Sequence, residues 1–422
     1  MKTIPIISFI LWFSVCSATA QTKPQKFEYP ATVPLSLNIS ADRLIYIDRL
    51  LQEYVGKGII PHALTFVAKN GVTIHNKAFG WSDIESGKAL KKDDIFRIFS
   101  QTKAIASVAL MTLFEQGKFQ LDDPVSKYIP ECTNLVLEKW NHDGTYTTRP
   151  EASPVTIRHL LSHTSGLMGS VEMITIWRNK RNENRYQTVA DEVRDLIQFP
   201  LAFDPGTQWY YLNMAPNVCA YLVEIFSGQP FRDYVKESIL IPLGMKDTDW
   251  YYPESYRERL VTAYNGVEGK LVARNNVWTA RNPFQADIRY CEGGTGLYGT
   301  IEDYARFCQM LLNGGTFNGK RVLGRRTIEM MSVDQLPHPN NGGPDFHFGL
   351  GFQIYPDKET ERKGVHRFTP MVTPGSLKWY GMYNTDFLID PKEELIILLY
   401  TNCLLDTKIW EKFLNTVYQA LN

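Results

Sequence analysis

The sequence predicts an α/β fold of the α+β kind, in which strands from both chain ends form one antiparallel sheet flanked by helices. Near the N-terminus, apolar and β-branched runs at residues 63–68 and 72–75 enclose Asn70-Gly71, a pair typical of a tight hairpin. Near the C-terminus, residues 385–390 and 395–401 have the same character. A mostly helical lobe lies between these strands in the sequence, and we expect an active site in the cleft between the two lobes.

Periodicity and capping residues predict three of the helices. Apolar residues recur at helical spacing from Leu44 to Tyr54, after Ser40 as the predicted N-cap. Residues 300–303, Thr-Ile-Glu-Asp, form a capping-box pattern that opens a helix ending near Gly314. An amphipathic helix is expected over about residues 408–421.

The first residues have the pattern of a secretory signal. A charged start at Lys2 precedes a mostly apolar stretch and then Ala18-Thr19-Ala20. We expect cleavage after Ala20 and a periplasmic or secreted protein without a membrane span, because no later stretch reaches the roughly 18 apolar residues that a spanning helix needs. Cys16 is not expected to carry a lipid anchor, because Val15 is a poor fit to the small residue that usually precedes a lipid-modified cysteine.

The chain is therefore expected to have a short processed start followed by one domain. The predicted boundaries are a signal peptide at 1–20, an extended lead-in at 21–39, and a domain at 40–422 whose sheet lobe spans about 40–95 and 315–422 and whose helical lobe spans about 100–314.

Composition narrows the class of partner. With 44% hydrophobic residues and equal numbers of basic and acidic residues, 45 each, the chain can bury a large core and lacks the positive charge typical of nucleic-acid binding. The composition therefore favours a small-molecule or peptide-like substrate over a nucleic acid. The cysteines after residue 20 are odd in number and widely spaced, so they predict buried thiols, no disulfide framework, no metal site and no cofactor.

The strongest chemical signal is Ser100-Gln101-Thr102-Lys103, just before the apolar run at residues 104–111. A serine hydroxyl needs a neighbouring base to become a nucleophile, and side chains three residues apart share one face of a helix. A helix N-terminus favours negative charge and burial disfavours an ammonium, so both favour an ionisable serine beside a neutral lysine. Because S-x-x-K also arises by chance, this assignment depends on partners downstream.

Two downstream segments supply candidate partners. Tyr211 and Asn213 form a Tyr-x-Asn pair after a turn, and residues 379–382, Trp-Tyr-Gly-Met, lead into a strand. Each has an ordinary structural alternative: a core aromatic for Tyr211, a turn amide for Asn213, and strand packing for Trp379 and Tyr380.

Taken together, these motifs resemble the serine β-lactamase and penicillin-binding-protein superfamily, in particular its class C-like branch, which includes esterases and D-amino-acid peptidases. The resemblance covers about residues 40–422. Further segments that are similar to family landmarks follow in family order: 96–99, 121–124, 159–167, 243–245 and 293–297. The resemblance implies a β-lactamase/transpeptidase-like fold.

The resemblance also implies catalytic roles. Ser100 would attack a carbonyl, Lys103 would keep the proton network basic, and Tyr211 would take the serine proton and return it to the leaving group. Either Lys103 or Tyr211 could be the general base, and a nearby lysine ammonium is expected to lower the pKa of Tyr211. Asn213 would hydrogen-bond Lys103 or the substrate amide.

The third motif would supply one backbone donor of the oxyanion hole and the strand along which the substrate binds. Backbone N–H groups of Ser100 and Met382 would bind the developing negative charge, and Gly381 would let substrate approach the strand closely. Trp379 and Tyr380 would line the cleft.

This chain has Trp-Tyr-Gly where penicillin-recognising members place Lys-Thr-Gly or His-Thr-Gly, and strand alternation directs Lys378 to the opposite face. Weak β-lactam hydrolysis is therefore expected.

These observations predict a serine hydrolase that forms an acyl-enzyme on Ser100 and hydrolyses a small ester, amide or D-amino-acid peptide. The alternative is a penicillin-binding-like sensor that is acylated without turnover. No G-x-S-x-G or H-E-x-x-H motif supports another hydrolase class. His163 is expected to be a buried structural residue, and the basic stretch 178–185 to be a solvated surface segment.

Overall fold

The computed structural model describes residues 23–132, 135–141, 143–167, 170–183, 186–274, 282–284, 289–343, 346–356, 371–405 and 407–422. The predicted signal peptide, its cleavage site and Cys16 lie outside these ranges. In the described part of the chain, no helix combines the length and hydropathy that crossing a bilayer requires. The five cysteines after residue 20 are buried thiols, as predicted: Cys132, Cys219, Cys291, Cys308 and Cys403.

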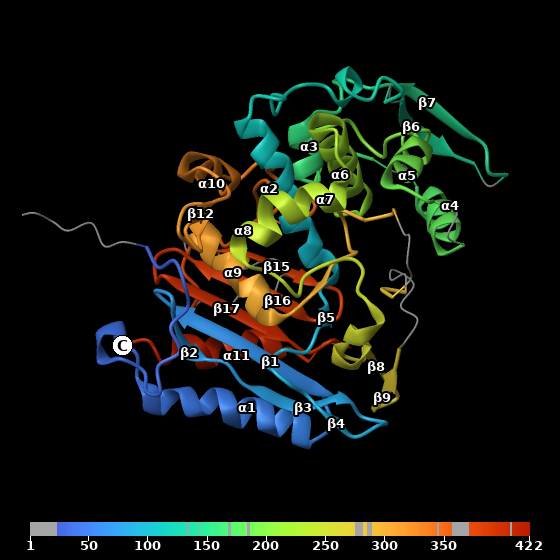
Figure 1. Cartoon of the computed structure of the whole chain (residues 1–422). Helices are drawn as coiled ribbons and strands as arrows, with labels where there is room; N and C mark the ends of the chain where they lie inside the picture. The colour runs from blue at the N-terminus through green and yellow to red at the C-terminus, as the bar shows by residue number, and fades with distance from the viewer. Residues whose placement is uncertain are drawn as a thin grey trace, which may run out of the picture.

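Strands from both chain ends form one nine-stranded antiparallel sheet, which confirms the predicted fold class (Figure 1). The N-terminal and C-terminal strands meet where β1 pairs with β17, and Leu64 lies opposite Tyr400 in this pairing. The strand order is β13 (His347–Phe348), β14 (Gln353–Ile354), β15 (Leu377–Gly381), β16 (Thr385–Asp390), β17 (Leu395–Tyr400), β1 (His62–Lys69), β3 (Ala78–Asp83) and β4 (Lys88–Ala89), with β2 (Val72–His75) also paired to β1.

The predicted N-terminal hairpin forms as expected. Asn70 and Gly71 both adopt positive φ angles, 48° and 75°, which the tight turn between β1 and β2 requires. Asparagine and glycine tolerate this region better than other residues, so the turn chemistry in the sequence fixes the position of the hairpin.

Helices cover both faces of the sheet. Alternate residues of β17 enter two separate cores: Ile396 and Leu398 pack in one, Ile397 and Leu399 in the other. One face is covered by α1 (Ile45–Gly56) and α11 (Ile409–Tyr418), and the other by α9 (Ile301–Leu312) with α2 (Thr102–Glu115) beyond it (Figure 1). Burial on both faces explains why β17 reads as an unbroken apolar run.

The middle of the chain is mostly helical, with short strands that the sequence analysis did not predict. Its helices are α3 (Ile157–Leu161), α4 (Val171–Asn182), α5 (Val189–Leu196), α6 (Met214–Ser227), α7 (Phe231–Val235) and α8 (Ile241–Leu243), followed by α10 (Arg325–Met331). The short strands are β5 (Phe96–Arg97), β6 (Leu135–Trp140), β7 (Tyr146–Pro150), β8 (Tyr264–Val267), β9 (Lys270–Ala273), β10 (Tyr298–Gly299), β11 (Thr316–Phe317) and β12 (Lys320–Arg321). A further short strand near the C-terminus, β18 (Cys403–Leu404), pairs with β8.

Two predicted helix starts differ from the structure. Ser40 makes no side-chain cap, and its N–H donates instead to the carbonyl of Ala420, so a 3-10 turn, η2 (Ala41–Leu44), precedes α1. The nucleophile candidate, Ser100, lies in another 3-10 turn, η3 (Phe99–Gln101), two residues before α2 begins. The predicted capping box of α9 forms only in part: the Asp303 N–H donates to the Thr300 hydroxyl at 3.3 Å, but the Asp303 carboxylate accepts hydrogen bonds from Asp247 and Thr248.

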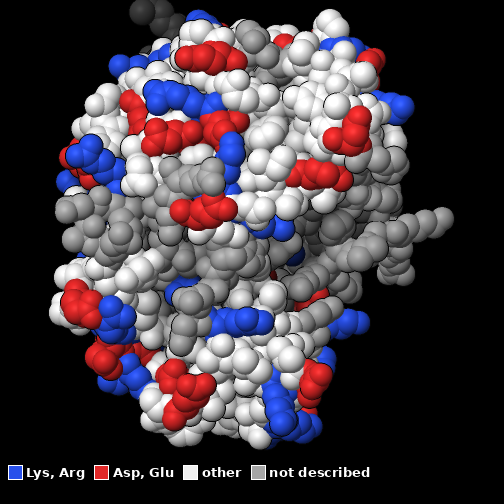
Figure 2. Space-filling view, turned by 90° about the vertical axis from the view of Figure 1, so that its right-hand side faces the viewer, with Lys and Arg blue, Asp and Glu red and all other residues white. Residues whose placement is uncertain are grey.

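Basic and acidic side chains are mixed on the face shown in Figure 2. On the face shown in Figure 2, basic and acidic residues alternate over the upper and lower parts, and the described residues of this view form no large field of one sign. This distribution agrees with the formal net charge of +0.

Candidate active site

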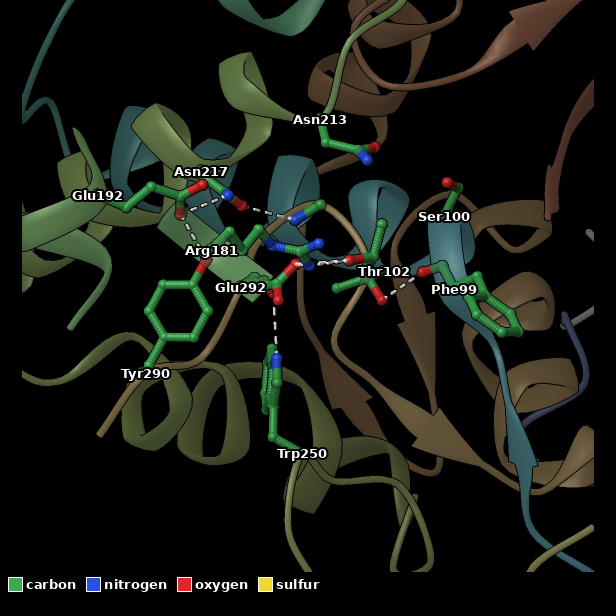
Figure 3. Close-up of polar contacts among 12 residues, drawn as sticks. Phe99, Ser100, Thr102, Arg181, Glu192, Asn213, Asn217, Trp250, Tyr290 and Glu292 are labelled. Carbon is green, nitrogen blue, oxygen red and sulfur yellow. Dashed lines mark hydrogen bonds and ion pairs between the residues drawn. The ribbon is translucent and has the colours of Figure 1, made fainter. Parts of the chain in front are cut away.

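Ser100 lies in a turn with a constrained backbone. The preceding residue, Phe99, has φ +45°, a region that L-residues rarely adopt. Its ring stacks on Tyr383 with centroids 5.0 Å apart, and the Thr102 hydroxyl donates to its carbonyl at 2.6 Å. Figure 3 shows the hydrogen bond between Thr102 and Phe99. Both contacts hold the turn, and Ser100 is 8% exposed just before the buried helix α2. Strain of this kind clusters at functional sites.

Lys103 meets Ser100 directly. Its Nζ lies 3.0 Å from Ser100 Oγ, 2.7 Å from Asn213 Oδ1 and 2.7 Å from the carbonyl oxygen of Gly294. Burial lowers the pKa of Lys103 well below 10.5, Glu292 opposes this shift, and Arg181 adds to it. Burial therefore favours the neutral amine, which is the form able to accept a proton.

Tyr211 packs over this lysine rather than beside it. Lys103 Nζ lies 4.8 Å from the centre of the Tyr211 ring, and the rings of His163 and Trp379 lie 5.0 and 5.1 Å from that ring. Burial raises the pKa of Tyr211 well above 10, and contacts with Ser100 and Trp379 oppose only part of the rise. The expected lowering by a lysine ammonium is therefore wrong, because Lys103 is itself pushed toward neutrality and faces the ring.

His163 is buried, as predicted. It is 4% exposed, and burial lowers its pKa to about 3, so its imidazole is neutral near pH 7. Its ring contacts Tyr211 and Phe348. His163 thus helps to fix the Tyr211 ring in place.

Strand β15 brings the third motif to the turn that carries Ser100. A Cβ atom at Gly381 would lie 2.2 Å from Thr385 Oγ1 and 2.5 Å from the carbonyl oxygen of Ile98. Glycine is therefore needed for contact between two parts of the protein, whereas the sequence analysis attributed it to the approach of substrate. Met382 follows at the end of the strand and packs, half-buried, near Phe99.

Strand alternation separates the side chains of the third motif. Trp379 is buried and contacts Tyr211 and Phe348, whereas Tyr380 is 37% exposed. Lys378 points to the opposite face, as predicted, where its Nζ lies 5.6 Å from the centre of the Tyr355 ring. The site face of this strand is thus aromatic.

A buried charged cluster, not predicted from the sequence, is formed by Arg181, Glu192 and Glu292 (Figure 3). Arg181 forms an ion pair with Glu292, and both side chains are at most 5% exposed. The stretch 178–185 was predicted to be solvated, and for Arg181 this prediction is wrong. A run of basic residues on a polar helix gives no sign that one member turns inward.

Glu192 connects this cluster to the lysine. It accepts hydrogen bonds from Trp177, Tyr290 and Asn217, each at 2.7 Å. The other end of the Asn217 side chain accepts from the N–H of Gly294 at 3.0 Å, and the carbonyl of Gly294 accepts from Lys103. Burial raises the pKa of Glu192 to about 7. The chain of bonds fixes the Gly294 peptide in the orientation that receives the lysine.

The Beta-lactamase family model matches residues 47–410. The chain belongs to the β-lactamase family. This confirms the resemblance to the serine β-lactamase and penicillin-binding-protein superfamily and makes the protein a member of a group of serine hydrolases and acyltransferases.

One relative and two solved structures illustrate the proteins that this chain is similar to. Esterase EstB of Burkholderia gladioli is 27% identical over 377 residues, 84% of this chain and 89% of that protein. The solved structure of EstCE1, described as a hydrolase with promiscuous acyltransferase activity, has a TM-score of 0.74 at 24% identity and covers 90% of this chain and 99% of that one. Simvastatin synthase LovD from Aspergillus terreus has a TM-score of 0.73 at 22% identity, over 89% and 98% of the two chains.

In this β-lactamase-family chain the fold brings together Ser100, Lys103, Tyr211 and Asn213, and sets the Trp379 strand beside them. A hydroxyl, an amine, an amide and a phenol form a proton-transfer set rather than a metal-ligand set. Such a set can carry acyl transfer through a serine ester.

Proposed function

We propose that this protein is a serine hydrolase that forms an acyl-enzyme on Ser100 and hydrolyses a small ester, amide or D-amino-acid peptide, with only weak action on β-lactams. The observation that carries the proposal is the 3.0 Å approach of Lys103 Nζ to Ser100 Oγ within a buried site. Burial lowers the pKa of this lysine, which suits it to act as a base.

The proposed reaction has two halves. In the first, the Ser100 proton passes to neutral Lys103, with Tyr211 as a relay, while Oγ bonds to the substrate carbonyl carbon. The resulting oxyanion is stabilised by the backbone N–H groups of Ser100 and Met382, and the leaving group departs with the proton. In the second half, water loses a proton to the same base and attacks the acyl carbon, which releases the acid and regenerates Ser100.

The aromatic third motif supports an ester or neutral acyl substrate over a penicillin. Trp379 presents a buried apolar surface beside Tyr211, and the neighbouring Lys378 points away from the site. A β-lactam carboxylate would therefore lack the cation or hydroxyl that a Lys-Thr-Gly strand offers. The name of the relative EstB, an esterase, is consistent with this preference.

Intact-mass spectrometry with a fluorophosphonate, p-nitrophenyl acetate and a penicillin tests the proposal. We expect one adduct with the fluorophosphonate, an acetyl adduct that clears with time, and slow or absent reaction with the penicillin. Ser100→Ala should abolish every adduct. Ser107→Ala, a buried serine further along α2 that the mechanism does not use, is the matched control and should react normally.

Two results would contradict parts of this proposal. An adduct that persists in the Ser100→Ala protein would refute the nucleophile. A penicillin adduct that never clears, with no ester turnover, would instead support the sensor alternative. We also propose that the reaction occurs in the periplasm or outside the cell. N-terminal sequencing of the mature protein tests this, because it should show cleavage after Ala20.

A further inference from the structure

Three potential metal ligands meet at the edge of the sheet, away from the Ser100 motif. The ligand atoms of Asp334, His338 and His347 all lie within 4.8 Å of one another. Asp334 Oδ2 lies 2.5 Å from His338 Nε2 and 2.6 Å from His347 Nδ1. Asp334 follows α10, and His347 begins the edge strand β13, so the cluster joins two separate elements.

The carboxylate of this cluster is oriented by the backbone. Asp334 Oδ1 accepts hydrogen bonds from the N–H groups of Phe348, at 3.0 Å, and Leu336, at 3.3 Å. Its second oxygen is thereby turned toward the two imidazoles. Outer hydrogen bonds that fix a ligating carboxylate in this way are a recurring part of metal sites.

Exposure leaves room for an ion to enter. The side chain of His338 is 39% exposed, and those of His347 and Asp334 are 23% and 26% exposed. Water can therefore reach the cluster and complete a coordination shell. His338 Nδ1, on the far side of its ring, lies 3.4 Å from the Asn340 amide nitrogen.

We propose that Asp334, His338 and His347 bind one divalent transition-metal ion, with zinc as the expected ion. Two imidazoles and a carboxylate suit zinc and its neighbours, whereas calcium and magnesium prefer oxygen ligands alone. Zinc bonds to such ligands are about 2.0–2.2 Å long, so the donor atoms of a tetrahedral site stand about 3.3 Å apart. The two short contacts need to open by less than about 1 Å, which the partial exposure of both imidazoles allows.

This site would brace a wall of the active-site region. Phe346 and Phe348 flank His347 in the sequence, and they contact Trp209 at 4.4 Å and Trp379 at 5.2 Å between ring centroids. A bound ion would tie the segment after α10 to the strand that carries these aromatic contacts. Its role is structural, so acylation of Ser100 does not depend on it. No metal site was predicted from the sequence, because these three residues match neither the cysteine spacings nor the H-E-x-x-H motif and meet only in the folded chain.

The test is direct metal binding by the full-length protein after dialysis against a chelator. We expect isothermal titration with Zn²⁺ alone to give one equivalent per chain, and Zn²⁺ to raise the melting temperature by several degrees. Co²⁺ should give visible absorption bands typical of bound imidazole. His338→Gln and His347→Gln should each weaken binding at least tenfold and abolish the melting shift.

A second histidine–carboxylate pair provides the matched control. His75 Nε2 lies 3.0 Å from Asp48 Oδ1, but the other oxygen of Asp48 pairs with Lys77 at 2.6 Å instead of a second histidine. His75→Gln should therefore leave one zinc equivalent in place. Absence of stoichiometric zinc binding in the wild type would overturn the proposal. The cluster would then be only a pair of histidines hydrogen-bonded to Asp334. Binding that survives in both the His338 and His347 variants would also overturn it.

Discussion

A neutral Lys103 has two N–H hydrogens and one lone pair, and its three neighbours match this count. Asn213 Oδ1 and the Gly294 carbonyl can only accept hydrogen bonds, so they take the two hydrogens. The lone pair then remains for the Ser100 hydroxyl, 3.0 Å away. The hydrogen-bond inventory is thus compatible with a neutral amine, and the lowered pKa of Lys103 favours that form and hence the lysine as the base.

The phenol of Tyr211 is expected to relay the proton rather than to store it as a tyrosinate, because burial raises the pKa of this group. Tyr211→Phe keeps the ring contacts with His163 and Trp379 and removes only the hydroxyl. We expect kcat for p-nitrophenyl acetate to fall about 100- to 10,000-fold with little change in melting temperature. The adjacent, 47% exposed Tyr210 gives the control variant Tyr210→Phe, which should retain full activity.

At the residue scale, the sequence predicts the residues that come with a motif and misses those that do not. Ser100 and Lys103 were found because three-residue spacing on a helix carries a physical meaning. Arg181, Glu192 and Glu292 lie on separate segments and meet only in the folded chain. No local pattern marks a charged residue that is buried by tertiary contacts, so this cluster was not predictable.

At the scale of elements, the approach of β15 to the η3 turn is the contact on which the site depends. Gly381→Ala would place a methyl group against the Thr385 side chain and the Ile98 backbone, neither of which can move freely. We expect a loss of about 1–3 kcal/mol in stability and at least a tenfold loss of activity, because the strand must withdraw from Ser100. Denaturant unfolding and ester hydrolysis measure the two effects.

The matched control for Gly381 is Gly56, at the exposed end of α1. A Cβ atom there meets nothing within 4 Å, and its backbone does not require positive φ. Gly56→Ala should leave activity unchanged and stabilise the protein by up to about 1 kcal/mol. Equal behaviour of the two variants would contradict the packing role assigned to Gly381.

Element type was predictable where apolar periodicity is strong, and not where it is weak. The hairpin at Asn70-Gly71 and the apolar face of α1 are in the predicted places. The hairpin of β6 and β7 was missed because most of its residues are partly or fully exposed and lack regular apolar alternation. The exact start of α2 was missed because a 3-10 turn and an α-helix share one sequence pattern at this point.

At the scale of the whole molecule, the sheet joins residues far apart in the sequence into one unit. The pairing of β1 with β17 means that the C-terminal helix covers a sheet whose other face carries the core next to the active site. The sequence supported this arrangement because strand-like runs occur at both ends. It did not predict how the helical lobe packs, because that packing depends on long-range contacts.

Because both chain ends share one sheet, we expect that a destabilising substitution on the face covered by α1 and α11 also disrupts the active site on the other face. Phe413 on α11 is fully buried, at 0% exposure, on the face opposite α9. Phe413→Ala should cost about 3–5 kcal/mol and lower the melting temperature. Labelling of Ser100 by a fluorophosphonate and the loss of tertiary circular dichroism should share one midpoint on heating. Two separate midpoints would mean that the sheet and the helical part unfold independently.

The most direct test of the central claim is the pH dependence of Ser100 labelling by a fluorophosphonate, followed by intact mass in the wild type and in Lys103→Arg. A pKa held low in the folded protein means that the neutral lysine dominates above that pKa, so the wild-type rate should rise with pH and level off well below pH 10.5. Arginine stays protonated, so the variant should react at least about 100-fold more slowly at every pH. A wild-type rate that rises only above pH 10, or an Lys103→Arg protein that reacts normally, would contradict the assignment of Lys103 as the base that activates Ser100.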